Sequence, residues 1–182
     1  MPTLIPVLKA ADIFPEYRHT PIERLLRHHN LGEPLPPANG HAEMLIGMCM
    51  DHRKDLRLPN EFAYVLRGAG GNLSDSEFEI SYAIAVGGIS ALALLSHSDC
   101  GMTNLASKRE TFIRGLMERG GWDEESASRQ FAQYAARYEI GDPLHFVTTE
   151  AARLRLVYPG VMIVPLLYTV EDDLLVQIDE KS

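Results

Sequence analysis

The segment MLIGMCMDHR (residues 44–53) places an uninterrupted apolar run directly before a cysteine, an aspartate and an arginine. Such a run, without alternation of apolar and polar residues, is typical of a strand buried on both faces. The segment ISALALLSHSDCGM (residues 89–102) repeats the arrangement, with an apolar run over 89–95 ahead of His97 and Cys100. The sequence therefore predicts two buried strands, each followed at its carboxyl end by residues of metal-ligating type.

The other segments predict helices that alternate with further strands. The patterns at residues 20–23 (TPIE) and 74–77 (SDSE) are typical of capping boxes at helix starts. We expect helices over about 20–29, 74–86, 103–119, 123–138 and 142–158, strands at 44–48, 62–66 (also buried), 89–95, 161–168 and 174–178, and a Pro- and Gly-rich loop or arm over 32–40. This order predicts an α/β fold with a mostly parallel β-sheet flanked by helices. We expect a single domain over 1–182, in which 1–40 form an N-terminal helix and arm.

A metal centre is predicted at one edge of this sheet. Ligands of parallel sheets bind at the carboxyl ends of the strands, where Cys49, His97 and Cys100 all fall. Two thiolates and one imidazole form the Cys2His set with which a catalytic zinc keeps a fourth position for water. Asp51 would accept a hydrogen bond from that water, and Arg53 could keep Asp51 ionised and aimed through a bidentate contact. The leading hypothesis is therefore a zinc hydrolase or hydratase.

Composition excludes several other classes of protein. The chain of 182 residues has a net charge of −8 and scattered basic residues, which argues against a nucleic-acid partner. No apolar run approaches the roughly 18 residues of a membrane span, and the first residues do not resemble a signal peptide. Both cysteines would bind a metal as thiolates, which requires that they stay reduced and therefore suits a reducing compartment. We therefore expect a cytoplasmic protein.

Three motifs resemble those of a known family, the β-class carbonic anhydrases. The motifs are Cys49-x-Asp51-x-Arg53, His97-Ser-Asp-Cys100-Gly101-Met102, and Arg67-Gly-Ala-Gly-Gly-Asn72, which is similar to that family's Arg-Asn-Ala-Gly-Asn stretch. The resemblance extends from Leu45 to Met102 and rests on element order elsewhere. It implies a β-carbonic-anhydrase-like fold and one zinc ion per chain that interconverts CO2 and bicarbonate by zinc-hydroxide attack.

The resemblance also assigns roles to residues of this chain. Cys49, His97 and Cys100 would bind zinc, and Asp51 with Arg53 would form the catalytic dyad. The family is built on an obligate dimer with active sites near the subunit interface, sometimes assembled further, so a homodimer or higher homo-oligomer is implied.

Three departures from the family pattern concern the rim of the pocket. His52 replaces the usual serine between the dyad residues, the connection from Arg53 to the next strand is short and contains Pro59, and Gly68 replaces an asparagine, with an extra glycine before Asn72. As a histidine, His52 could serve as a proton shuttle, but it could equally be an exposed loop residue. His28 and His29 fall at a helix end, where cations are favourable, and are expected to be structural.

Two alternatives to CO2 hydration remain open from the sequence. The same fold and metal site are known to hydrolyse carbon disulfide or carbonyl sulfide, which are linear and apolar like CO2. Alternatively, the chain is a non-catalytic zinc-binding relative, in which Asp51 or His52 closes the metal site. Replacing Asp51 by Asn separates these classes, since an enzyme would lose rate and keep zinc, whereas a site closed by Asp51 would lose metal affinity or stability.

Overall fold

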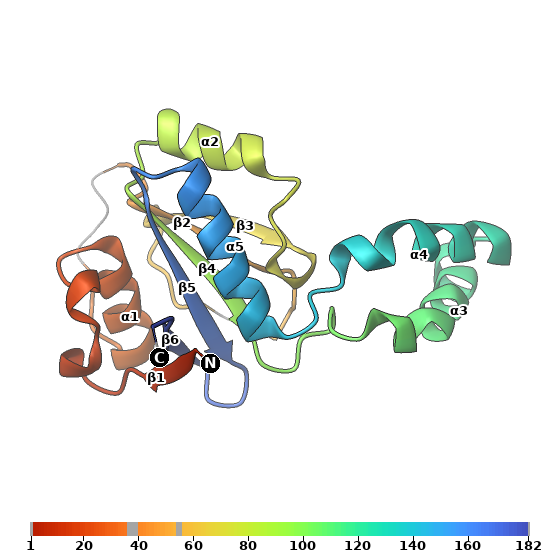
Figure 1. Cartoon of the computed structure of the whole chain (residues 1–182), viewed down its shortest axis with the longest axis horizontal. Helices are drawn as coiled ribbons and strands as arrows, with labels where there is room; N and C mark the ends of the chain where they lie inside the picture. The colour runs from red at the N-terminus through yellow and green to blue at the C-terminus, as the bar shows by residue number, and fades with distance from the viewer. Residues whose placement is uncertain (1, 36–39, 54–55, 182) are drawn as a thin grey trace.

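A six-stranded sheet forms the centre of the computed structural model, which describes residues 2–35, 40–53 and 56–181 (Figure 1). Its strands are β1 (Thr3–Pro6), β2 (Met44–Cys49), β3 (Ala63–Gly68), β4 (Ala91–His97), β5 (Met162–Thr169) and β6 (Leu174–Asp179). Their spatial order is β1-β6-β5-β4-β2-β3. β3, β2, β4 and β5 are parallel, β6 is antiparallel to β5, and β1 is antiparallel to β6. The mostly parallel α/β architecture expected from the sequence is confirmed.

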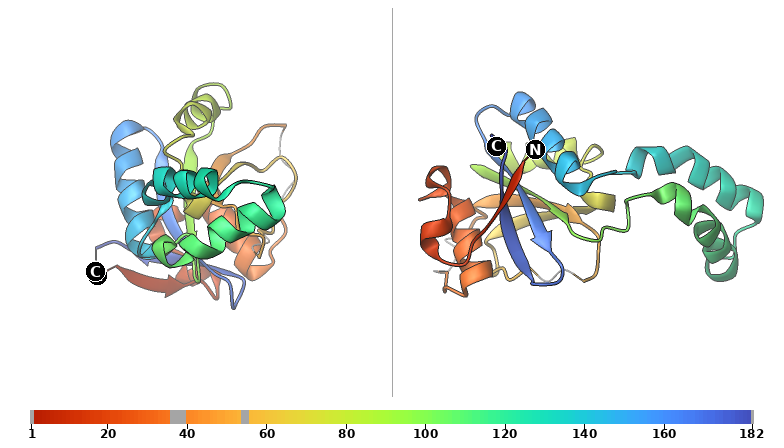
Figure 2. Two further views of the ribbon diagram at one scale, coloured as in Figure 1. Left: turned by 90° about the vertical axis from the view of Figure 1, so that its right-hand side faces the viewer. Right: turned by 60° about the horizontal axis from the view of Figure 1, so that its bottom comes forward.

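Helices cover both faces of the sheet (Figures 1 and 2). Helix α1 (Pro21–Leu31) packs on one face, and α2 (Glu77–Ala85) and α5 (Pro143–Val157) pack on the other. The side chains of β4 alternate between the two cores: Ala91, Ala93 and Leu95 face α1, whereas Leu92 and Leu94 face α2 and α5. A strand with a core on each side needs apolar residues at every position, which explains the uninterrupted run.

Three helix starts follow the expected capping chemistry. The side chains of Thr20, Asp123 and Asp142 accept hydrogen bonds from the backbone N–H groups of Ile22, Ser126 and His145. These caps begin α1, α4 (Glu124–Tyr138) and α5. Each satisfies a backbone donor that the helix itself leaves unpaired.

Two other predicted helix starts are wrong. The capping box expected at 74–77 does not form, because α2 begins only at Glu77 and its N-cap, Ser76, makes no side-chain hydrogen bond. Instead, Asn72 Oδ1 accepts a hydrogen bond from the Ser74 N–H at 2.9 Å, so residues 72–74 form a turn. The helix expected over 103–119 is divided into the short 3-10 helix η4 (Leu105–Lys108) and α3 (Arg109–Gly120).

The outer strands also differ from expectation. β1 was not predicted; it pairs with β6 and forms one edge of the sheet. β3 forms the other edge and is not buried on both faces, since Tyr64 and Val65 are each 41% exposed. Of the loop or arm predicted over 32–40, residues 36–39 lie outside the described part of the chain. The assignment of 1–182 to a single domain stays a prediction.

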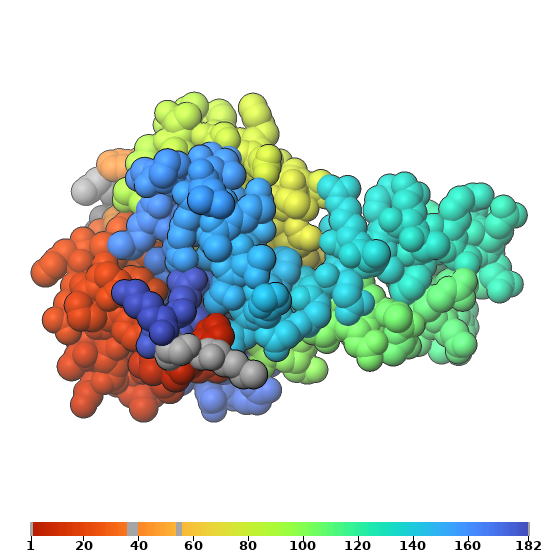
Figure 3. Space-filling model, in the orientation of Figure 1, coloured from red at the N-terminus to blue at the C-terminus, as the bar shows by residue number. Residues whose placement is uncertain are grey.

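Helices α3 and α4 project from the body as a two-helix arm (Figures 2 and 3). A pocket of about 560 Å³ lies where the arm meets the body, and its lining includes Met102, Phe112 and Phe131. Among the described residues, no helix combines the length and apolar character needed to span a membrane.

Candidate metal centre

The three predicted metal ligands meet at the carboxyl edge of the sheet. Cys49 ends β2, His97 ends the neighbouring parallel strand β4, and Cys100 follows three residues later. The Sγ atoms of the two cysteines and a ring nitrogen of His97 all lie within 4.8 Å of one another. Tetrahedral zinc with ordinary ligand distances separates its ligand atoms by about 3.5–4 Å, so this cluster is close to the required spacing.

The histidine is oriented for coordination by its own loop. His97 Nδ1 lies 2.8 Å from the backbone oxygen of Ser98, which can accept a hydrogen bond from this nitrogen and so fixes the tautomer. His97 Nε2 is buried, has no hydrogen-bond partner, and keeps a lone pair available in that tautomer. A buried nitrogen without a partner costs stability unless something binds it. The donor set and this nitrogen together fit a zinc ion.

Two glycines allow neighbouring segments to approach the centre. Gly71 has φ of 78°, and a Cβ at this position would lie 3.2 Å from the Leu95 oxygen and 3.5 Å from the Cys49 nitrogen. Gly70, with φ of 67°, would place a Cβ only 2.5 Å from a side-chain carbon of Ile140. A positive φ and close packing both favour glycine. The glycine-rich segment after β3 is therefore a tight turn that brings backbone against the metal centre.

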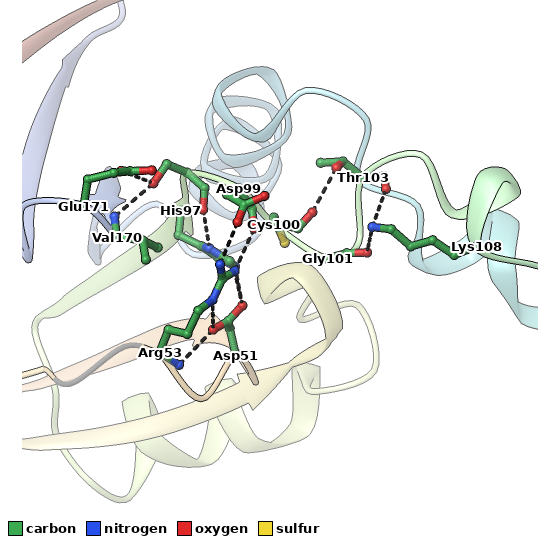
Figure 4. A network of polar contacts seen from close by, with 11 residues as sticks. Asp51, Arg53, His97, Asp99, Cys100, Gly101, Thr103, Lys108, Val170 and Glu171 are labelled. Atoms are coloured by element: carbon green, nitrogen blue, oxygen red, sulfur yellow. Dashed lines mark hydrogen bonds and ion pairs between the residues drawn. The ribbon is translucent and has the colours of Figure 1, made fainter. Parts of the chain in front are cut away.

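The predicted dyad is assembled beside the ligands (Figure 4). Arg53 donates from Nε to Asp51 Oδ1 at 3.0 Å and from Nη2 to Asp51 Oδ2 at 2.7 Å, which is a bidentate contact. Asp51 Oδ2 lies 4.0 Å from His97 Nε2. The hydrogen bonds that Arg53 donates to Asp51 and Asp99 raise the pKa of Arg53, so its positive charge is retained. In this conformation both Asp51 oxygens point to Arg53, so the arginine holds the carboxylate beside the cluster.

Comparison with solved structures identifies the fold. A carbonic anhydrase from Glaciozyma antarctica is 26% identical, covering 79% of this chain and 84% of its own, with a TM-score of 0.59. The β-carbonic anhydrase isoform I of Trichomonas vaginalis is 19% identical over 78% of this chain and 86% of its own, with a TM-score of 0.62.

This chain is a structural relative of the β-carbonic anhydrases. A carbon disulfide hydrolase in its apo form has a similar structure: 19% identity, coverage of 86% of this chain and 85% of its own, and a TM-score of 0.57. No protein-family model matches the sequence, and no curated protein matches it.

Within this β-carbonic-anhydrase fold, Asp99 has a structural role that was not predicted from the sequence. Arg53 donates to Asp99 Oδ2 at 2.6 Å and to the Asp99 backbone oxygen at 2.8 Å. Asp99 has φ of 51°, a left-handed conformation that Asp tolerates better than most residues. Its position inside the His97–Cys100 motif was the available signal, but the contact with Arg53 depends on how two distant loops meet.

The predictions for His52 and His29 have different outcomes. His52 is exposed on the loop that carries the dyad, and its part in proton transfer stays a prediction. His29 was expected to be structural as a cation at a helix end, but the structure buries this side chain in the core, and burial lowers its pKa. In the short connection after Arg53, residues 54–55 lie outside the described part of the chain.

Proposed function

We propose that this chain catalyses the reversible hydration of CO2 to bicarbonate with one zinc ion held by Cys49, His97 and Cys100. The observation that carries the proposal is the cluster of Cys49, His97 and Cys100, whose ligand atoms lie within 4.8 Å of one another. The buried His97 Nε2 has no hydrogen-bond partner and lies 4.0 Å from Asp51 Oδ2. Three protein ligands leave the fourth position of a catalytic zinc to water, and Asp51 is held beside the cluster.

Bound zinc supplies a Lewis acid that lowers the pKa of a coordinated water to about 7, the value established for carbonic anhydrase itself. Asp51 Oδ2 accepts a hydrogen bond from the attacking water and so directs a lone pair toward CO2. Arg53 holds both Asp51 oxygens, which keeps the carboxylate ionised and away from the metal. Met102 and Ile140 pack against the two cysteines, giving an apolar wall that suits a linear, uncharged substrate.

Stopped-flow CO2 hydration at about pH 8.5, where the coordinated water is deprotonated, tests this proposal. The zinc content is measured in the same sample, and the variant Asp51→Asn is compared with the unaltered chain. Rapid hydration that falls by about 100-fold or more in Asp51→Asn, with zinc retained, supports the dyad mechanism.

A fully zinc-loaded protein without CO2 hydration would contradict the proposal and direct assays to carbon disulfide and carbonyl sulfide. The carbon disulfide hydrolase shares the fold, so the fold does not distinguish these substrates. A non-catalytic site closed by Asp51 is disfavoured because Arg53 engages both of its carboxylate oxygens. Loss of zinc in Asp51→Asn would instead favour the closed site.

We also propose that the chain forms a homodimer or larger homo-oligomer in the cytoplasm, as the resemblance to the β-carbonic anhydrases implies. The projecting arm and its apolar pocket support an assembly, since Phe112 and Tyr134 are 38% and 39% exposed in the isolated chain. Both cysteines are thiols at the metal cluster, which fits a reducing compartment. Light scattering on zinc-loaded protein measures the assembly directly, and a monomeric mass would contradict it.

A further inference from the structure

The turn between β5 and β6, residues 170–173, contacts the loop that carries two of the proposed metal ligands. Ser98 Oγ donates to Glu171 Oε2 at 2.9 Å and accepts from the Val170 N–H at 2.9 Å (Figure 4). The Ser98 N–H also donates to the Tyr168 oxygen at 3.0 Å. Because Ser98 lies between His97 and Cys100, these bonds fix the ligand loop against the turn.

The same turn also contacts Arg57. Asp173 Oδ2 accepts from Arg57 Nη2 at 2.7 Å, and Arg57 lies four residues after Arg53. Tyr168 donates its hydroxyl to Asp173 Oδ1 and is the register partner of His97 across β4 and β5. The Asp173 carboxylate thus joins Arg57 to Tyr168 of β5, the strand beside His97.

A buried histidine completes this attachment. His29 is 0% exposed, and its Nδ1 accepts the backbone N–H of Arg57 at 3.2 Å. Because Nδ1 is the acceptor, the ring proton is assigned to Nε2, which lies 3.9 Å from Asp173 Oδ1. Arg57 is therefore held by its backbone through His29 and by its guanidinium through Asp173.

We propose that Asp173 is a positioning residue for the Asp51–Arg53 dyad. It anchors Arg57, four residues after Arg53 in the chain, while Glu171 in the same turn fixes the loop of His97 and Cys100. The turn thereby sets how the two halves of the metal centre face each other. This inference rests on the proposed function, since it assigns Asp173 to the same reaction.

The effect of Asp173 is geometric rather than a contribution to overall stability. The side chains of Arg57 and Asp173 are 49% and 44% exposed, and ion pairs this exposed stabilise a fold little. Displacing a positioned catalytic group by about 1 Å, however, can cost about 100-fold in rate. Loss of the contact should therefore change the turnover more than the melting temperature.

The test compares Asp173→Asn with Asp172→Asn, which removes the same charge from an exposed neighbour in the same turn. Both variants are prepared with zinc and with cobalt, whose visible absorption reports the metal geometry. In Asp173→Asn we expect full metal content, altered cobalt bands, and kcat lower by about 10- to 100-fold at nearly unchanged KM. Asp172→Asn should match the unaltered chain in every measurement.

Cobalt bands and kcat that are unchanged in Asp173→Asn, or equally changed in both variants, would overturn the proposal. If Asp173→Asn does not fold, Arg57→Lys is judged by the same criteria, because it keeps the charge and loses the planar guanidinium. Should the unaltered chain fail to hydrate CO2, the proposed function fails, and the cobalt bands still decide the role of Asp173.

Discussion

Arg53 donates to the carboxylate of Asp99 at 2.6 Å, which ties the dyad to the loop that carries His97 and Cys100. The backbone oxygen of Asp99 accepts a second hydrogen bond from the same guanidinium at 2.8 Å. Arg53 therefore has its orientation set by both loops of the metal centre, rather than by Asp51 alone.

Replacing Asp99 by Asn should weaken this second attachment while keeping the side-chain size. We expect kcat for CO2 hydration to fall by about 10-fold, because Arg53 then orients Asp51 less precisely. The melting temperature should hardly change, since the Asp99 side chain is 76% exposed. Asp172→Asn serves as the charge control, and a kcat equal to that of this control would show that Asp51 suffices to place Arg53.

Removing Arg53 should release Asp51 toward the metal. In Arg53→Gln we expect hydration to fall by about 100-fold or more while zinc binding stays equal or becomes tighter, because Asp51 can then occupy the fourth position. Rates and zinc dissociation are measured for Arg53→Gln, Asp51→Asn and the double variant. Residues acting as a unit give losses that do not add, whereas additive losses would contradict a dyad.

The sequence predicted the central strands and the meeting of Cys49, His97 and Cys100 because local patterns specify them. β2 and β4 have a core on each face, so their apolar runs are continuous and end at the ligand motifs. β1 has no such pattern: three of its four residues are exposed, it ends at Pro6, and its partner β6 lies at the other end of the chain. Strands defined by distant pairing leave little signal in their own residues.

Contacts between distant loops account for what the sequence did not show at the site. Asp99 and Arg53 are 46 residues apart, and their hydrogen bond depends on the left-handed backbone at Asp99. His29 was expected to be structural, but its burial left no sign in the sequence for a similar reason. The C-terminal end of a helix favours a cation where the side chain is exposed to solvent. Here the packing of α1 against Tyr168 buries the His29 ring.

Gly71→Ala should destabilise the protein because the new Cβ meets the backbone of the metal centre. Gly88 has a similar φ, 70° against 78° for Gly71, but nothing lies within 4 Å of a Cβ at that position. Gly88→Ala therefore measures the cost of the left-handed backbone alone, about 1 kcal/mol. We expect Gly71→Ala to cost about 1–2 kcal/mol more in the free energy of unfolding, measured in urea on zinc-loaded protein. Equal losses in the two variants would mean that the turn moves away without resistance.

The protein should lose stability as the pH falls below about 6.5, the ordinary pKa of histidine, because the buried His29 resists protonation. Burial lowers the pKa of His29 most strongly; Asp173 opposes this shift, and Arg57 and His28 add to it. Since the pKa is lower in the folded state than in the unfolded state, the unfolded chain takes up the proton first. His29 thus contributes stability above about pH 6.5 that is lost in acid, by up to about 1.4 kcal/mol per pH unit.

Urea unfolding of His29→Gln between about pH 7.5 and pH 5 checks this expectation, since Gln can still accept the hydrogen bond from Arg57 but does not titrate. The variant should be less stable than the unaltered chain at neutral pH and should lose less stability in acid. His28→Gln, at the adjacent and partly exposed position, is the matched control and should retain the acid sensitivity that the burial of His29 causes. An identical pH dependence in His29→Gln would show that other groups cause the acid sensitivity, and that His29 is not the buried neutral residue that anchors Arg57.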